Sequence, residues 1–285
     1  MTPSLIALAL AQAAASAPAT PPASAASPDR ARFEACAIEA REAPERAVDT
    51  ANAWRVQGGG LDARQCLGLA YVALGRWRSA ATAYEQAARE AETAQDPRRT
   101  MFWVQAGNAW LAADEGTKAI QSFDSALASP RLADELRGEV HLDRARALVA
   151  LGTSAEARAD LDRALQLVPA DPMAWYLSAA LSARQSNLVR AASDIARARQ
   201  LAGNDPDVLL LAGTIAGLQG NGAEAERLYT QVATAAPQSD AGRRAAAALA
   251  SMRDVAPAGA DPAATTPAPA PAATTTPQQP APQPR

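Results

Sequence analysis

The sequence predicts an all-α fold made of helix pairs that repeat along the chain, and three observations carry this prediction. The apolar 48% of the 285 residues is mostly Ala and Leu, which are strong helix formers, and aromatic residues make up only 4%. Runs of β-branched residues with alternating polarity are missing, so we expect no sheet. A short pattern of small and large apolar residues also returns every 34 to 39 residues.

The repeat is clearest when the sequence is aligned on one alanine in the middle of each unit. A small residue stands twelve residues before this alanine, a large apolar residue four after it, and Ala or Val seven after it. Because these positions recur at three and four, each half of a unit is expected to be an amphipathic helix. A residue suited to a turn, five before the alanine, separates the two helices. The central alanines are Ala80, Ala119, Ala157, Ala191 and Ala225, at spacings of 39, 38, 34 and 34 residues.

The second unit shows the whole pattern. Its residues are Trp103, Ala106, Gly107, Trp110, Ala119, Phe123, Ala126 and Pro130. This order resembles the tetratricopeptide repeat family, whose units are about 34 residues long. The resemblance covers residues 61–237 with five units. It implies an all-α, right-handed α-α superhelical solenoid of tetratricopeptide helix pairs with a C-terminal capping helix.

Further helices are expected on both sides of the five repeats. A degenerate helix pair around Ala47 is predicted at residues 29–60, where three glycines end it as a loop. Residues 238–254 are predicted to form the capping helix, since a solenoid needs a polar end. Aspartate before proline is suited to begin a helix. Such pairs occur at Asp96-Pro97, Asp171-Pro172 and Asp205-Pro206.

The two ends of the chain are expected to lie outside the helical stack. Residues 1–17 predict a signal peptide, because an apolar run leads into small residues with Ala-x-Ala spacing. No Lys or Arg precedes that run, so an alanine-rich leader is the alternative. Residues 18–28 predict a disordered leader, and the Ala/Pro-rich residues 255–285 a disordered tail. A periplasmic or otherwise exported protein is therefore expected, or a cytoplasmic one if the leader is not a signal.

The residue types needed for catalysis, metal binding or nucleic-acid binding are scarce. His141 is the only histidine and is expected at the surface, and two cysteines and one histidine fall short of a zinc site. The three glycines at residues 58–60 lack the Gly-Lys-Ser/Thr of a phosphate loop. The net charge of −3 is spread along helices without a basic stripe. We expect no enzyme activity, no cofactor, no metal, no nucleic acid and no integral membrane span.

The two cysteines fall on adjacent first helices if the degenerate pair exists. Cys36 belongs to that pair and Cys66 to the first repeat. In an oxidising compartment they are expected to form a disulfide that joins the two units. Two buried free thiols are the alternative.

The resemblance also implies that the first helices line a concave groove that holds a polypeptide. Their faces away from the packing stripe are more apolar than a solvated face, which is typical of a protein-binding surface. The alternative is that tight winding of the superhelix buries some of these residues. Glu139 and Asp143 stand where carboxylate-gripping members carry positive charge, so no such clamp is expected. The predicted groove residues are Met101, Val104, Asn108, Leu111, Glu139, Leu142, Arg146, Val149, Met173, Tyr176, Arg184, Asp207 and Leu210.

The function that follows is a scaffold or adaptor that binds a protein or peptide partner in its groove, in the bacterial cell envelope. The alternative is a structural subunit of an envelope assembly that uses its end helices for contacts. Either role is compatible with an oligomer or a larger complex.

Overall fold

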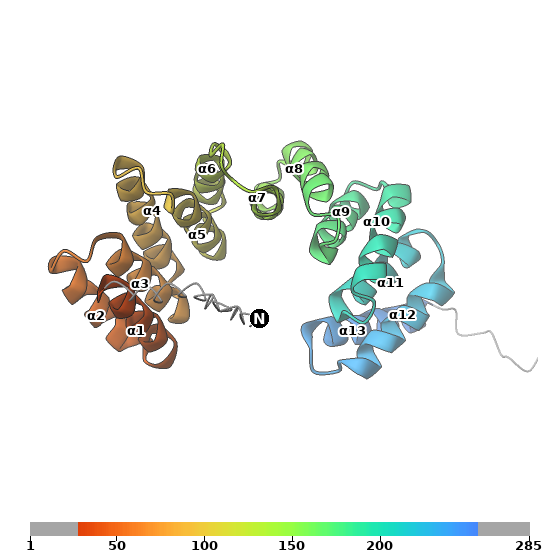
Figure 1. Cartoon of the computed structure of the whole chain (residues 1–285). Coiled ribbons are helices and arrows are strands. Elements are labelled where there is room, and N and C mark those ends of the chain that lie inside the picture. The colour runs from red at the N-terminus through yellow and green to blue at the C-terminus, as the bar shows by residue number, and fades with distance from the viewer. Residues whose placement is uncertain (1–27, 256–285) are drawn as a thin grey trace, which may run out of the picture. The chain divides into compact units, whose positions relative to one another are not determined.

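The structure, a computed structural model, describes residues 28–255 and is helical throughout them (Figure 1). No strand occurs within this range, which confirms the predicted all-α class. The helices are α1 (Pro28–Glu42), α2 (Pro44–Val56), α3 (Gly60–Ala73), α4 (Trp77–Thr93), α5 (Arg99–Ala112), α6 (Gly116–Leu127), α7 (Asp134–Ala150), α8 (Ser154–Leu167), α9 (Pro172–Arg184), α10 (Leu188–Leu201), α11 (Pro206–Leu218), α12 (Gly222–Ala235) and α13 (Asp240–Val255).

The chain divides into two compact units, Met1–Leu181 and Ser182–Arg285, and the boundary lies within α9. In the first unit each helix from α3 to α8 packs on the next, and α5 also contacts α7. Figure 1 shows α4, α6 and α8 along one side of this unit and α3, α5 and α7 along the other. In the second unit α11 packs against α10, α12 and α13. The predicted signal peptide, leader and tail lie outside the described residues, apart from the first residue of α1 and the last of α13.

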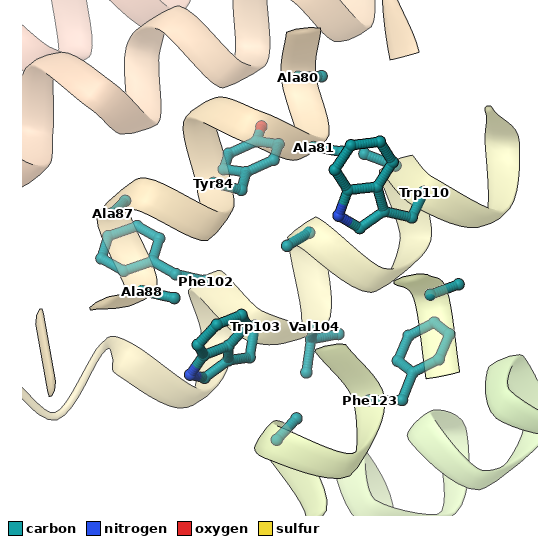
Figure 2. Packing of buried hydrophobic residues seen from close by; sticks show 14 of the residues in the cluster. Ala80, Ala81, Tyr84, Ala87, Ala88, Phe102, Trp103, Val104, Trp110 and Phe123 are labelled. Atoms are coloured by element: carbon teal, nitrogen blue, oxygen red, sulfur yellow. The ribbon is translucent and has the colours of Figure 1, made fainter. Parts of the chain in front are cut away.

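The repeated sequence positions are the packing positions of the helix pairs. All five central alanines are at most 1% exposed. A Cβ added to Gly68 would lie 2.4 Å from the ring of Tyr84, and one added to Gly107 would lie 2.5 Å from the ring of Phe123. These distances are too short for any side chain, so glycine lets the aromatic ring of the second helix press against the backbone of the first. Figure 2 shows Tyr84 and Phe123 among the buried residues of the cluster that α4, α5, α6 and α7 form.

The turn between the two helices of a pair has the same backbone conformation in each repeat. The residue five before the central alanine has a positive φ of 59° to 81° in all five units. This left-handed conformation ends the first helix and reverses the chain. The residues are Gly75, Asp114, Gly152, Ser186 and Gly220.

Two of the three Asp-Pro pairs begin a helix as expected. The Asp205 carboxylate accepts hydrogen bonds from the backbone amides of Asp207 and Val208 at the start of α11. Asp171 accepts one from the amide of Met173 at the start of α9. Asp96 differs, because α5 begins only at Arg99 and Asp96 instead binds the backbone and side chain of Arg98. The long spacing before the second repeat is taken up partly by α4, which has 17 residues.

The cysteines join the first helix pair to the first repeat. Helices α1 and α2 lie within the segment in which the degenerate pair was expected, and α1 packs on both α2 and α3. Cys36 of α1 and Cys66 of α3 are 2% and 0% exposed, and their sulfur atoms lie at bonding distance with a Cα–Cα separation of 6.1 Å. The buried face of α1 holds Cys36 and Ala40, whereas Ala35, which stands twelve residues before Ala47 at the position of the small residue in the other units, is exposed.

Candidate protein-binding surface

Ten of the thirteen predicted groove residues lie in the first unit, on the first helices α5, α7 and α9 of its repeats. Arg184, Asp207 and Leu210 belong to the second unit, in which the first two are exposed. In the first unit, Met101 and Met173 are 44% and 51% exposed. Exposed methionine is flexible and polarisable, so it adapts to apolar groups of different shapes. The side chains of Asn108, Glu139 and Arg146 are also exposed, and those of Leu111, Val149 and Tyr176 are half-buried.

Three of the predicted groove residues are instead part of the protein interior. Val104 is 7% exposed, Leu142 5% and Leu210 6%. The prediction was wrong for them because a first helix here has neighbours on three sides. Helix α5 contacts α4, α6 and α7, and α11 contacts α10, α12 and α13. The buried arc of such a helix is therefore wider than the stripe that packs against its own partner, so the exposed groove is less apolar than the sequence predicted.

The polar part of this surface centres on Asp143 of α7. Arg146 donates a hydrogen bond to its carboxylate at 3.2 Å, and Asn108 of α5 hydrogen-bonds to it as well. Burial raises the pKa of Asp143; Arg146 and Asn108 partly offset this effect, and the charge of Asp171 adds to it. A half-buried carboxylate of this kind favours a partner that supplies N–H donors or a positive charge.

A buried ion pair lies between the two helices of the third repeat, where no functional group was expected. His141, predicted at the surface, has a side chain only 15% exposed, and its Nδ1 lies 2.9 Å from Oδ1 of Asp160. Arg144 donates to both oxygens of Asp160, through Nε at 2.7 Å and Nη2 at 2.9 Å. The Asp160 side chain is 4% exposed. Burial alone raises the pKa of Asp160, but the hydrogen bonds and charges of His141 and Arg144 outweigh it and lower that pKa.

Asp160→Asn is expected to lower the free energy of unfolding at pH 7 by about 2–3 kcal/mol, because it removes the charge that two buried donors share. The folded pKa is lower than the unfolded one. The stabilisation is therefore present above the unfolded pKa and is lost as pH falls through the folded pKa. Urea unfolding at pH 7 and at pH 3 should show a large difference between wild type and variant that shrinks in acid.

Asp124→Asn provides the matched control for this prediction. Asp124 also pairs with Arg144, but its side chain is 52% exposed, so its loss should cost less than about 1 kcal/mol. Equal effects of the two substitutions at pH 7 would contradict the assignment of Asp160 as the buried partner.

A sequence signal for this ion pair exists three residues after each central alanine. The residues at this position are all buried: Ala83, Ser122, Asp160, Asp194 and Leu228. A charged residue at a position that is otherwise small or apolar predicts a buried, paired carboxylate. Asp194 in the second unit is also a buried, paired carboxylate, with Nε of Arg190 of its own helix at 3.3 Å.

Residues 28–255 contain neither a metal-binding cluster nor a membrane-spanning helix. Within this range, no three His, Cys, Asp or Glu side chains group closely enough to hold a metal ion. None of the described helices combines the length and the hydropathy that crossing a bilayer requires.

Stacked helix pairs joined by left-handed turns, with a small residue facing a large one, define a helical repeat protein. Tetratricopeptide repeat models match residues 67–134 and residues 138–181. The chain is a tetratricopeptide repeat protein, as its sequence pattern predicted.

Solved structures support the same fold. PilW, described as a widely conserved type IV pilus biogenesis factor, is 19% identical with a TM-score of 0.64, and the match covers 76% of this chain and 97% of PilW. PilF of Pseudomonas aeruginosa is 17% identical with a TM-score of 0.60, over 77% of this chain and 99% of PilF. YrrB, described as having an unusual peptide-binding site, is 18% identical with a TM-score of 0.51, over 69% and 96%. No curated protein sequence matches the chain. At these identities the likeness concerns the fold alone.

Proposed function

We propose that the chain is a non-enzymatic scaffold of the cell envelope, whose first unit binds a polypeptide along α5, α7 and α9. The observation that carries the proposal is the pairing of exposed methionines with a polar centre. Met101 and Met173 offer apolar contact area, and the half-buried Asp143 offers an acceptor for backbone amides or for a basic side chain. A bound peptide can contact both, because its apolar side chains pack on the methionines while its backbone amides or basic side chains donate to the carboxylate.

The envelope location rests on two further points. The apolar run near the N-terminus is suited to export. The pairing of Cys36 with Cys66 is the arrangement expected in an oxidising compartment. N-terminal sequencing of the mature protein from fractionated cells tests it: a start after residue 17 in the envelope fraction is expected, and an intact leader in the cytosol would contradict it.

Groove binding is tested by substitutions at exposed positions only, so that the fold is preserved. A photo-crosslinking amino acid at Met101 should trap the same partner as one at Met173. Met101→Glu combined with Met173→Glu should weaken binding at least about tenfold, because both apolar contacts are lost and negative charge is added. Val56→Glu is the control, since Val56 is 80% exposed on α2. A partner that binds both variants equally well would place its contacts elsewhere, as in the alternative of end-helix assembly.

A further inference from the structure

The second helices of the first unit carry a pair of cavities on the side away from the predicted groove. One has a volume of about 470 Å³ and lies among α2, α3 and α4. The other has a volume of about 370 Å³ and lies among α4, α5 and α6. Each cavity opens between two successive second helices, with the intervening first helix at its base, so the feature repeats with the helix pairs.

The floor of each cavity is aromatic. Tyr71 of α3 lines the first cavity and Trp110 of α5 the second, and both stand nine residues before the central alanine of their repeat. Trp103, about two turns before Trp110 on the same face of α5, enlarges the second floor. Figure 2 shows Trp103 and Trp110 projecting from the same helix. Aromatic rings at the base of a cavity provide apolar area for an incoming side chain at little conformational cost.

The rims of the cavities are positively charged. Arg55 and Arg78 line the first cavity, and Arg89 and Lys118 line the second. Lys118 Nζ lies 4.4 Å from the centre of the Trp110 ring, and the Arg89 guanidinium lies 5.8 Å from that of Trp103. Both cations therefore lie over the faces of the rings that line the second cavity.

Acidic residues compensate these cations only in part. Glu85 is the acidic residue that lines the cavities, and it accepts a hydrogen bond from Arg89. Glu115 is shared between Arg78, at 2.9 Å, and Lys118, at 3.4 Å. Glu92 accepts a hydrogen bond at 2.7 Å from Nε1 of Trp103, which lines the second cavity. Four cations thus face three carboxylates. This local excess of positive charge contrasts with the chain's net charge of −3.

We propose that this outer face is a second polypeptide-binding site, which takes an extended acidic segment of a partner protein. Apolar or aromatic side chains of the segment enter the two cavities, and its carboxylates pair with the rim cations. Charge complementarity selects this occupant. The chain's own residues 256–285 do not fit, since Asp261 and Arg285 are their only charged side chains. The site does not depend on groove binding by α5, α7 and α9.

The test is fluorescence anisotropy with the full-length mature chain and a labelled, end-blocked peptide of sequence Glu-Phe-Asp-Glu-Leu-Asp-Glu-Phe-Asp. Saturable binding that weakens with salt is expected. Three control probes represent other occupants of the site. They are the same peptide with Lys in place of every Asp and Glu, a peptide of residues 262–284, and a short oligothymidylate. If any of these binds as tightly as the acidic peptide, the proposed occupant is wrong.

Substitutions in the two cavities test where the peptide binds. Gln86 lines the first cavity and Gln121 the second, and both are exposed, so each is changed to Glu. The substitution preserves side-chain shape but adds negative charge. The double variant should therefore weaken binding of the acidic peptide about tenfold, and Lys118→Gln should weaken it as well. Gln166→Glu on α8 is the matched control and should leave affinity within about twofold, as should Arg146→Glu in the groove. Unchanged affinity in the double variant, with its helical circular dichroism intact, would overturn the proposal.

Discussion

Replacing Phe123 with alanine is expected to lower the free energy of unfolding of the first unit by about 3–5 kcal/mol, as large-to-small changes of buried aromatics do. Phe123 is 0% exposed and belongs to the core cluster formed by α4, α5, α6 and α7. Its ring presses against the backbone of α5 at Gly107, so alanine leaves a cavity that a glycine opposite cannot fill. Urea unfolding with hydrogen exchange at α5 and α6 measures the loss where it occurs.

A double-mutant cycle with Gly107 tests the physical reason for this effect. Gly107→Ala alone should cost about 1–3 kcal/mol, because its Cβ would lie 2.5 Å from the Phe123 ring. In the Phe123→Ala background the same methyl group finds space, so Gly107→Ala should cost far less there or even stabilise the chain. Additive costs in the double variant would show that the two positions do not share one packing contact.

The sequence predicted these contact positions because one small set of residue types repeats at each of them. In three of the five repeats a Gly twelve before the central alanine lies against the aromatic ring of the residue four after it. The turn residue between the two helices adopts positive φ in all five repeats. Because the pattern is read from five repeats, an unusual residue in one of them does not change it. The predictions of these packing and turn positions were therefore the most accurate. The candidate groove was harder to predict. Whether Val104 or Leu142 is exposed depends on how closely the next first helix approaches, and that distance does not recur as a sequence pattern.

The ion pair of Asp160 was missed for a related reason. The contact position three residues after the central alanine tolerates Ala, Ser, Asp and Leu, so it lacks the uniform residue type by which the other positions were found. Its burial becomes evident only when the five repeats are compared by position rather than by residue. The outer-face cavities were not predicted, because Trp110, which lines one of them, is also a core residue at 6% exposure and its residue type does not distinguish the two roles.

Removing the Cys36–Cys66 bridge is expected to lower the free energy of unfolding of α1–α3 by about 3–4 kcal/mol, from the entropy that a loop of this length regains when unfolded. The two cysteines are 30 residues apart in sequence and link α1 to α3 across α2. The substitution should be Cys36→Ala with Cys66→Ala, because both sites are buried and a serine hydroxyl there would lack a partner. Urea unfolding with and without dithiothreitol measures the difference.

The effect should be local, because α1 and α2 are held to the repeats mainly through α3. Helix α1 contacts α2 and α3, and α2 contacts α1 and α3. Hydrogen exchange in α1 and α2 should therefore accelerate on reduction while that in α5 and α6 stays unchanged. The double alanine variant should not respond to dithiothreitol. Alkylation of both cysteines in denatured, unreduced mature protein would show that the thiols are free in the cell. That result would contradict the predicted stabilisation by the disulfide and would take away one argument for an oxidising compartment.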